Sequence, residues 1–277
     1  MTTNRLHVVL HVPKCAGSTM EHHLAKHLGP LRFWSPGKRR TRIPLETYER
    51  KYDATLPAPT ENIAAVSGHF LGRSIEDFFP GRSIVRSVIL REPERFFLSL
   101  YNFRMMLHVV AGRNPLSFKL FVKSLQVDPV AHFLLDRWLE RPWLNIVAMS
   151  AAQKAALLDE MLGGFDQVVD ITKADELIAW HSRDLGIPEQ AARTNTEDEW
   201  VRKSGWKPLR SSDLDPSDRD ALAGRLNLDR YIWRRWALKE PVSFDSNAVA
   251  PFLLNELPRP IYQLRRRLAR RFKLARG

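Results

Sequence analysis

The sequence predicts an α/β fold in which helices flank a central parallel sheet. Short apolar runs typical of buried strands alternate with longer segments of helical periodicity along the chain. No internal repeat or low-complexity tract interrupts this alternation. Strands separated by helices form parallel sheets with right-handed crossover connections, so we expect one such sheet with helices on its faces.

The individual elements follow from the pattern in chain order. We expect strands at about 6–12, 63–67, 84–90 and 167–171. Helices are expected at 18–28, 93–111, 115–125, 129–140, 151–162, 174–185, 216–225 and 228–239, with a short helix near 75–79. Residues 1–244 are then one domain, and residues 245–277 form a linker and a basic amphipathic tail.

The first strand runs directly into a loop of the kind that binds phosphate. The apolar run Val8–Val12 is followed by Pro13-Lys14, by Cys15-Ala16 and by Gly17-Ser18-Thr19, where helical periodicity begins. Loop amides and the dipole of the following helix attract an anion, and Lys14 adds a full positive charge. The lysine precedes the glycine, so the order differs from the ATP-binding pattern G-x-x-x-x-G-K-[ST].

Two further motifs place side chains that can bind a ligand or transfer a proton near strand ends. The run 86–90 is typical of a buried strand and leads into Arg91, and a helix with Pro93 in its first turn carries Arg95 and, two turns in, Ser99. The run 63–67 ends near His69. Side chains at the carboxyl ends of parallel strands face the ligand side of an open sheet, and an imidazole titrates near neutrality. His69 is therefore a candidate general base.

These motifs resemble those of sulfotransferases that use 3′-phosphoadenosine 5′-phosphosulfate (PAPS), in particular the carbohydrate or Golgi-type members. The residues that match the family's 5′-phosphosulfate loop are His11, Val12, Pro13, Lys14, Gly17, Ser18 and Thr19. Those that match its 3′-phosphate segment are Leu90, Arg91, Pro93, Arg95, Ser99 and Tyr101. Weaker matches are 165–172, with the family's late strand, and 193–196 and 229–233, with segments near its last helices.

The resemblance implies a P-loop-like fold and transfer of a sulfuryl group from PAPS to a hydroxyl of a carbohydrate or glycolipid, with 3′,5′-adenosine bisphosphate as the product. It implies Lys14 and His69 as catalytic residues. The residues implied for the 5′-phosphosulfate are Lys14, Ala16, Gly17, Ser18 and Thr19; for the 3′-phosphate, Arg91 and Ser99 with Arg95 in support; and for the adenine, Thr172. The scheme needs no metal, and we expect His23 and His27, one turn apart without a third ligand, on a surface face.

Composition adds expectations about the compartment. The chain has 277 residues and a single cysteine, so one domain is expected and no intramolecular disulfide can form. Cys15 is interpreted as a small residue that fills the loop. No apolar stretch near Met1 is long enough to cross a bilayer, unlike the anchor of Golgi members. We expect a soluble, bacterial-type cytoplasmic protein.

The net charge of +12 is unevenly distributed. The segment 257–277 holds eight basic residues and no acidic ones, which leaves +4 for the rest of the chain. This distribution argues against a nucleic-acid binder. The tail's apolar residues recur at helical spacing, so it either contacts an anionic membrane peripherally, at the inner surface, or packs on the body of the protein. The basic cluster 38–42 either steers an anionic ligand or is a solvated loop.

Two other functions are alternatives to that of a sulfotransferase. A nucleotide-dependent P-loop kinase needs a lysine after the second glycine and an aspartate for magnesium at a strand end, where this chain has Arg91. A non-catalytic adaptor that binds a membrane or polyanion does not explain Lys14, His69, Arg91 and Ser99 together.

Overall fold

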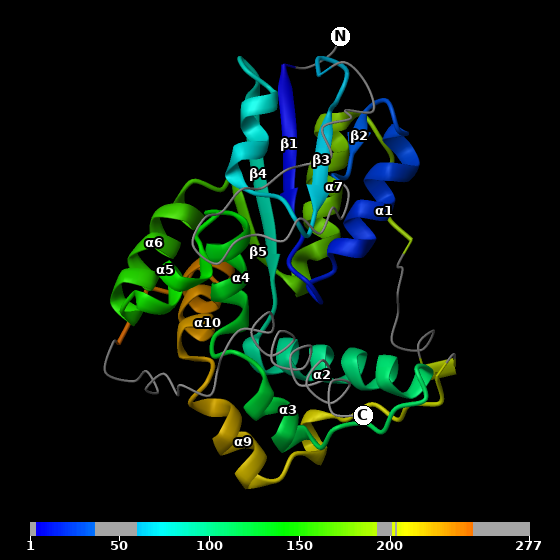
Figure 1. The fold of residues 1–277 in the computed structure, drawn as a ribbon. Coiled ribbons are helices and arrows are strands. Elements are labelled where there is room, and N and C mark those ends of the chain that lie inside the picture. The colour runs from blue at the N-terminus through cyan, green and yellow to red at the C-terminus, as the bar shows by residue number, and fades with distance from the viewer. Residues whose placement is uncertain (1–3, 37–59, 193–200, 203, 246–277) are drawn as a thin grey trace, which may run out of the picture.

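The computed structural model describes residues 4–36, 60–192, 201–202 and 204–245. In these residues, five parallel strands form one sheet in the order β2-β3-β1-β4-β5 (Figure 1). The strands are β1 (Arg5–Leu10), β2 (Phe33–Trp34), β3 (Ala65–Gly68), β4 (Ser83–Leu90) and β5 (Gln167–Asp170). The α/β fold class with a central parallel sheet is confirmed, and the four expected strands lie within two residues of their expected bounds at each end.

The register brings the carboxyl ends of the central strands to one edge of the sheet. Leu10 at the end of β1 pairs with Gly68 at the end of β3 and with Val88 near the end of β4. Leu6 to Leu10 are all buried, because helices cover both faces of β1. The loops after these three strands therefore start side by side, which is how the predicted motifs are brought together.

The helices also follow the expected order. They are α1 (Gly17–Leu28), α2 (Pro93–Val110), α3 (Phe118–Ser124), α4 (Pro129–Arg137), α5 (Trp143–Ala148), α6 (Ala151–Gly163), α7 (Ala174–Leu185), α9 (Pro216–Ala223) and α10 (Asn227–Ile232). The segment near 75–79 is the 3₁₀ helix η1 (Arg73–Phe78), and a π-helical turn (Trp233–Ala237) follows α10, where one continuous helix was expected. The two-residue strand β2 and the six-residue helix α5 were not predicted.

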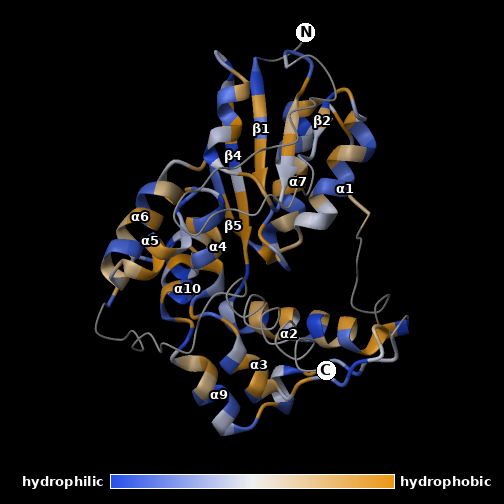
Figure 2. Ribbon diagram, in the orientation of Figure 1, coloured by the Kyte–Doolittle hydropathy of each residue, from blue (hydrophilic) through white to orange (hydrophobic). Residues whose placement is uncertain are grey.

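A second hydrophobic cluster lies below the sheet. Phe97 and Tyr101 of α2 pack edge-to-face against Phe118 and Phe121 of α3, and Leu222 of α9 belongs to the same cluster. Figures 1 and 2 show α2 lying across the lower ends of the strands, with apolar residues concentrated in the strands and along the helices that pack here. This cluster fixes α2 at the carboxyl edge of the sheet, where it can line a site.

Polar side chains join α7 to the sheet inside the core. His181 of α7 lies 2.7 Å from His7 of β1 and 2.8 Å from Ser87 of β4, and all three are fully buried. His7 also contacts Asp184 at 2.8 Å. The neighbouring Ser182 contacts His23 of α1 at 3.0 Å. The expectation that His23 lies on a surface face is therefore wrong: it is buried, because its ring supplies the hydrogen bond between α1 and α7.

Two aspartates cap each other's helices. Asp128 precedes α4, and its carboxylate accepts from the amides of Leu228 and Asp229 at the start of α10. Asp229 in turn accepts from the amides of Val130 and Ala131 at the start of α4. The first amides of a helix have no acceptor within the helix, so each carboxylate satisfies donors that burial would otherwise leave unbonded.

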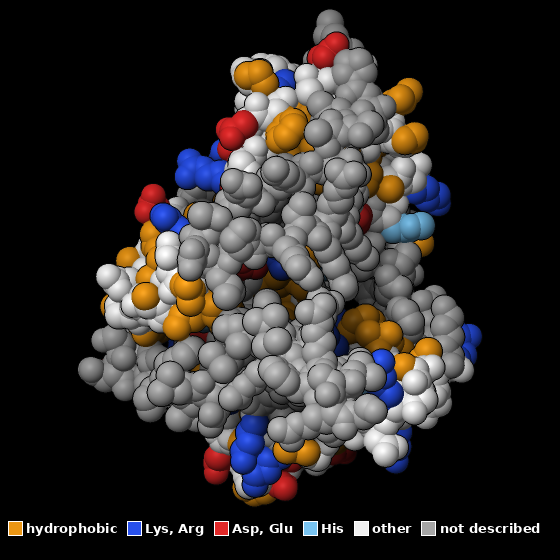
Figure 3. All heavy atoms as spheres, viewed as in Figure 1, with side chains coloured by type: hydrophobic (Ala, Val, Ile, Leu, Met, Phe, Trp, Pro, Cys, Tyr) orange, Lys and Arg blue, Asp and Glu red, His pale blue; other side chains and the backbone are white. Residues whose placement is uncertain are grey.

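Several sequence expectations concern residues outside the described ranges: the basic cluster 38–42, the loop 193–196 and nearly all of the segment 245–277. The division into a domain and a tail stays a prediction. Among the described residues on the face drawn in Figure 3, Lys and Arg side chains stand beside Asp and Glu side chains at the left and lower edges. Within the part of the chain that the structure describes, no helix is long and apolar enough to cross a membrane.

Candidate functional site

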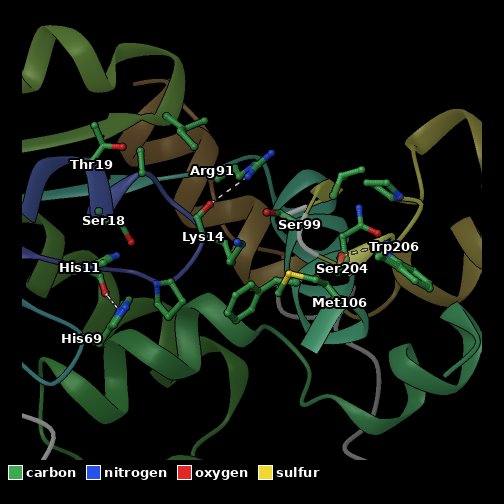
Figure 4. Close-up of a pocket in the computed structure, with 18 residues that line it drawn as sticks. His11, Lys14, Ser18, Thr19, His69, Arg91, Ser99, Met106, Ser204 and Trp206 are labelled. Atoms are coloured by element: carbon green, nitrogen blue, oxygen red, sulfur yellow. Dashed lines mark hydrogen bonds between the residues drawn. The ribbon is translucent and has the colours of Figure 1, made fainter. Parts of the chain in front are cut away.

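A pocket of about 400 Å³ lies at the carboxyl edge of the sheet (Figure 4). It is lined by the loop between β1 and α1, by the residues that follow β3 and β4, by one face of α2 and by the segment 201–208. The structure brings together in its lining eight of the ten predicted site residues, namely Lys14, Ala16, Gly17, Ser18, Thr19, His69, Arg91 and Ser99. Motifs more than seventy residues apart in the sequence thus share one cavity.

The loop after β1 has the backbone geometry of an anion-binding nest. Lys14 and Ala16 have positive φ angles of 65° and 59°, and Cys15 lies between them. Left-handed residues in such a loop turn backbone amides toward one concave face. The amides of Thr19 and Met20 already bond to the carbonyl of Ala16 and so start α1. Positive φ at non-glycine residues costs about 1–2 kcal/mol each, and such strain is concentrated at functional sites.

Two cationic side chains are held beside this loop. The ammonium of Lys14 lies 4.5 Å from the ring centroid of Phe103 on α2. The guanidinium of Arg91 donates to the backbone carbonyl of Lys14 at 3.2 Å. None of the described residues that line the pocket is acidic. The pocket therefore presents two fixed positive charges from different strand ends, which suits a ligand with more than one anionic group.

Cys15 is not a nucleophile in this arrangement. Its side chain is 1% exposed, and burial raises the pKa of the thiol to about 12. A thiol with this pKa stays protonated and unreactive at neutral pH. The structure agrees with the interpretation of Cys15 as a small residue that fills the core side of the loop.

His69 has a defined tautomer. Its Nδ1 lies 2.8 Å from the backbone carbonyl of His11, which can only accept, so Nδ1 carries a proton. In the neutral ring, Nε2 is then the nitrogen that accepts a proton. Because His69 also lines the pocket, it has the form that a general base requires.

Gly17 is required by the close approach of His11. A Cβ atom at position 17 would lie 1.9 Å from Cδ2 of the His11 ring, far inside van der Waals contact. His11 is 3% exposed, and its Nδ1 lies 2.9 Å from Glu21, so the ring cannot easily move aside. The glycine of the motif therefore lets the His11 ring pack against the start of α1.

The two remaining predicted site residues lie outside the pocket lining. The side chain of Arg95 is 70% exposed and forms an ion pair with Glu92 at 2.7 Å. Thr172 is exposed, and its hydroxyl donates to Asp170 at 2.7 Å. Burial alone would raise the pKa of Asp170, but hydrogen bonds from Thr172 and Trp233 outweigh it and lower that pKa below its ordinary value. Asp170 thus caps the 3₁₀ turn Ile171–Lys173 after β5 by accepting from Thr172, and Ile171 lines the pocket instead.

Some lining residues were not identified from the sequence. Asn102, Phe103 and Met106 follow Ser99 at helical spacing on α2, a periodicity that could have identified them. The amide of Asn102 exchanges two hydrogen bonds of 2.9 Å with the backbone of Leu209. These bonds hold the residues next to Leu209 against α2, where Val201, Ser204, Trp206 and Pro208 line the pocket. Figure 4 shows Ser204 and Trp206 at one end of it. No sequence signal marks these four residues.

Within the described residues, no group of His, Cys, Asp and Glu side chains could hold a metal ion. No family model matches the sequence. No curated protein matches it either. Among solved structures, the chain is similar to a sulfotransferase from Alicyclobacillus acidocaldarius, at 16% sequence identity and a TM-score of 0.39, over 85% of this chain and 100% of that one.

Proposed function

We propose that the protein is a sulfotransferase that moves a sulfuryl group from PAPS to an acceptor hydroxyl. The observation that carries the proposal is that one pocket is lined by two sets of residues with the chemistry to bind anions. The loop with Lys14 forms the first set, and Arg91 with Ser99 forms the second. PAPS has two separate anionic groups, the 5′-phosphosulfate and the 3′-phosphate, whereas ATP has only a 5′-chain.

The residues present fit this ligand. The cavity of about 400 Å³ is within the range of roughly 300–1,000 Å³ that is usual for sites of this size of molecule. Lys14, the nest amides and the hydroxyls of Ser18 and Thr19 would hold the phosphosulfate. Arg91 and Ser99 would hold the 3′-phosphate. Phe103, Met106 and Trp206 offer apolar surface on which the adenine ring of PAPS can pack.

Arg95 and Thr172 keep more distant proposed roles. Arg95 reaches the 3′-phosphate only if it leaves its ion pair with Glu92, an exposed pair of the kind that contributes little to stability. Thr172 acts on the adenine through the turn that places Ile171 in the pocket.

The reaction needs positioning and charge stabilisation. The acceptor oxygen attacks sulfur, the bond between sulfur and the bridging phosphate oxygen breaks, and 3′,5′-adenosine bisphosphate leaves. The acceptor proton passes to Nε2 of His69. Lys14 neutralises the charge that develops on the leaving phosphate. Because both groups are fixed before reaction, reorganisation in the transition state is small.

The acceptor is proposed from the motif resemblance: a hydroxyl of a carbohydrate or glycolipid. The cytoplasmic location and the peripheral contact of segment 257–277 with an anionic membrane are proposals of the same kind. Incubation of the protein with ³⁵S-labelled PAPS and fractionated lysate would identify the acceptor. We expect the ³⁵S label to be transferred to a carbohydrate or glycolipid fraction. A non-catalytic adaptor would transfer no label to any fraction.

The decisive experiment compares three nucleotides by calorimetry. The protein should bind 3′,5′-adenosine bisphosphate more tightly than AMP or ATP, because Arg91 and Ser99 contact a 3′-phosphate that the others lack. Arg91→Ala should remove this preference, with a loss of about 1.5–3 kcal/mol as for other charge-assisted hydrogen bonds. Equal affinity for all three nucleotides would refute the proposal. Preference for ATP with magnesium would favour a kinase, although the described lining residues include no carboxylate to hold that ion.

A further inference from the structure

His11 holds His69 at two points. The carbonyl of His11 accepts the hydrogen bond from Nδ1 of His69 at 2.8 Å. The two imidazole rings also pack on each other, with centroids 3.7 Å apart and a tilt of 32°. Figure 4 shows the two residues together at one end of the pocket. Any displacement of His11 therefore changes the orientation of His69.

The ring of His11 is fixed in turn by Glu21 of α1. One carboxylate oxygen of Glu21 lies 2.9 Å from Nδ1 of His11, and the other accepts from the hydroxyl of Ser35 at 2.7 Å. Burial would raise the pKa of Glu21, but these two hydrogen bonds outweigh it and lower the pKa below its ordinary value. The carboxylate is ionised at neutral pH and only accepts, so Nδ1 of His11 carries a proton.

We infer that Glu21 and His11 are positioning residues for His69. Glu21 orients the His11 ring, and His11 fixes both the tautomer and the plane of His69. The interpretation of His69 as a base rests on the proposed function; the positioning itself rests on the contacts.

Nitrogen-15 NMR of the imidazoles tests this inference without an acceptor substrate. Histidine-labelled protein gives nine ring systems, and the variant His69→Gln assigns the signal of His69. In the wild type, the spectra should show His69 protonated at Nδ1. Glu21→Gln should reduce the fraction of His69 that is protonated at Nδ1. Glu61→Gln, which removes an exposed carboxylate elsewhere, should leave that fraction unchanged.

Two further variants complete the design. In His11→Asn, the side-chain amide nitrogen lies as many bonds from Cα as Nδ1 of His11 and can still donate to Glu21. The variant removes the ring that stacks on His69, so it should reduce the preference of His69 for the Nδ1-protonated tautomer. Ser35→Ala removes only one hydrogen bond from the carboxylate, so it should act in the same direction as Glu21→Gln and gives a readout if that variant does not fold.

An unchanged His69 tautomer in folded Glu21→Gln, Ser35→Ala and His11→Asn would overturn the inference. Binding of 3′,5′-adenosine bisphosphate is measured on the same samples. Absence of binding by the wild type would refute the sulfotransferase proposal, while the NMR spectra would still decide whether Glu21 and His11 position His69.

Discussion

The Nδ1 atoms of His7 and His181 lie 2.7 Å apart in the core, so one of them must donate and the other accept. Asp184 can only accept when ionised, which assigns a proton to Nε2 of His7 and makes Nδ1 of His7 the acceptor. His181 then donates from Nδ1 and accepts from the hydroxyl of Ser87 at Nε2. With both rings neutral, every polar atom in this row has a partner.

This arrangement predicts a loss of stability in acid. Burial lowers the pKa of His181 from 6.5 to about 3 and also lowers the pKa of His7. The unfolded state therefore binds more protons below about pH 6.5, and each histidine reduces the free energy of unfolding by up to about 1.4 kcal/mol per pH unit there. His181→Gln should destabilise the protein by about 1–3 kcal/mol at pH 7.5, since it disrupts buried hydrogen bonds.

Urea unfolding at pH 7.5 and pH 5 checks this prediction. The difference between wild type and His181→Gln should become smaller at pH 5, because only the wild type must keep His181 neutral against the acid. A difference that is the same at both pH values would contradict the assignment of the pH effect to His181.

The mutual caps predict opposite outcomes for two substitutions of one residue. Burial raises the pKa of Asp128 to about 6. Burial, and after it the charge of Asp128, raises the pKa of Asp229 well above its ordinary value. A carboxylate whose pKa is raised on folding stabilises the protein less as pH rises through 6. Asp128→Asn keeps an acceptor for both amides and tolerates the φ of 49°, so it should be at least as stable as wild type at pH 8.

Asp128→Ala is the matched comparison. It removes the cap and should cost about 0.5–2 kcal/mol, as helix N-cap deletions do. Thermal unfolding at pH 8 measures both variants. Equal destabilisation by Asn and Ala would show that the charge of Asp128, and not its acceptor oxygen, is what α10 needs.

Gly17→Ala should disrupt the phosphate loop. The new Cβ atom overlaps the His11 ring, and forced repacking of a buried site costs about 1–3 kcal/mol. We expect weaker binding of 3′,5′-adenosine bisphosphate together with lower stability. Gly224→Ala is the control, because a Cβ atom there meets nothing within 4 Å. Wild-type binding by Gly17→Ala would mean that His11 can move without consequence for the loop.

His69→Ala should separate catalysis from binding. Turnover should fall by about 10²–10⁴-fold, the range for loss of a general base, while affinity for 3′,5′-adenosine bisphosphate should change little. Transfer of ³⁵S from labelled PAPS and calorimetry provide the two measurements. Lys14→Ala is the contrasting variant and should reduce both, since Lys14 would contact the phosphosulfate before and during reaction. Unchanged turnover in His69→Ala would refute the role of His69.

The segment 257–277 gives a prediction from sequence alone. Each basic residue near an anionic membrane contributes about 1 kcal/mol of attraction, which salt weakens. Deletion of 257–277 should abolish salt-sensitive flotation with vesicles that contain phosphatidylserine. Sulfuryl transfer to a soluble acceptor should continue, because every proposed site residue precedes the deletion. An insoluble truncated protein would instead show that the segment packs on the body.

The features that could be predicted from the sequence are those that a short local pattern determines. The strand of Val8 to Leu10, the turn at Lys14 and the strand end at Arg91 are each encoded by a few adjacent residues, and the parallel sheet brings them together. Trp206 could not be predicted in the same way, because hydrogen bonds between Asn102 and Leu209 place its segment and no periodicity marks it. The spacing of His23 and His27 suggested a surface face, but a distant serine on α7 makes His23 part of the core.

The pairing of Asp128 with Asp229 also constrains how the protein is made. Domains emerge from the ribosome with the N-terminal part first, at roughly 5–20 residues per second. The amides of Val130 and Ala131 donate to the carboxylate of Asp229, which lies 99 and 98 positions later in the chain. A nascent chain that ends before Asp229 therefore carries an uncapped α4 over an incomplete core. The capping of α4 by Asp229 is therefore completed only after α10 has been synthesised.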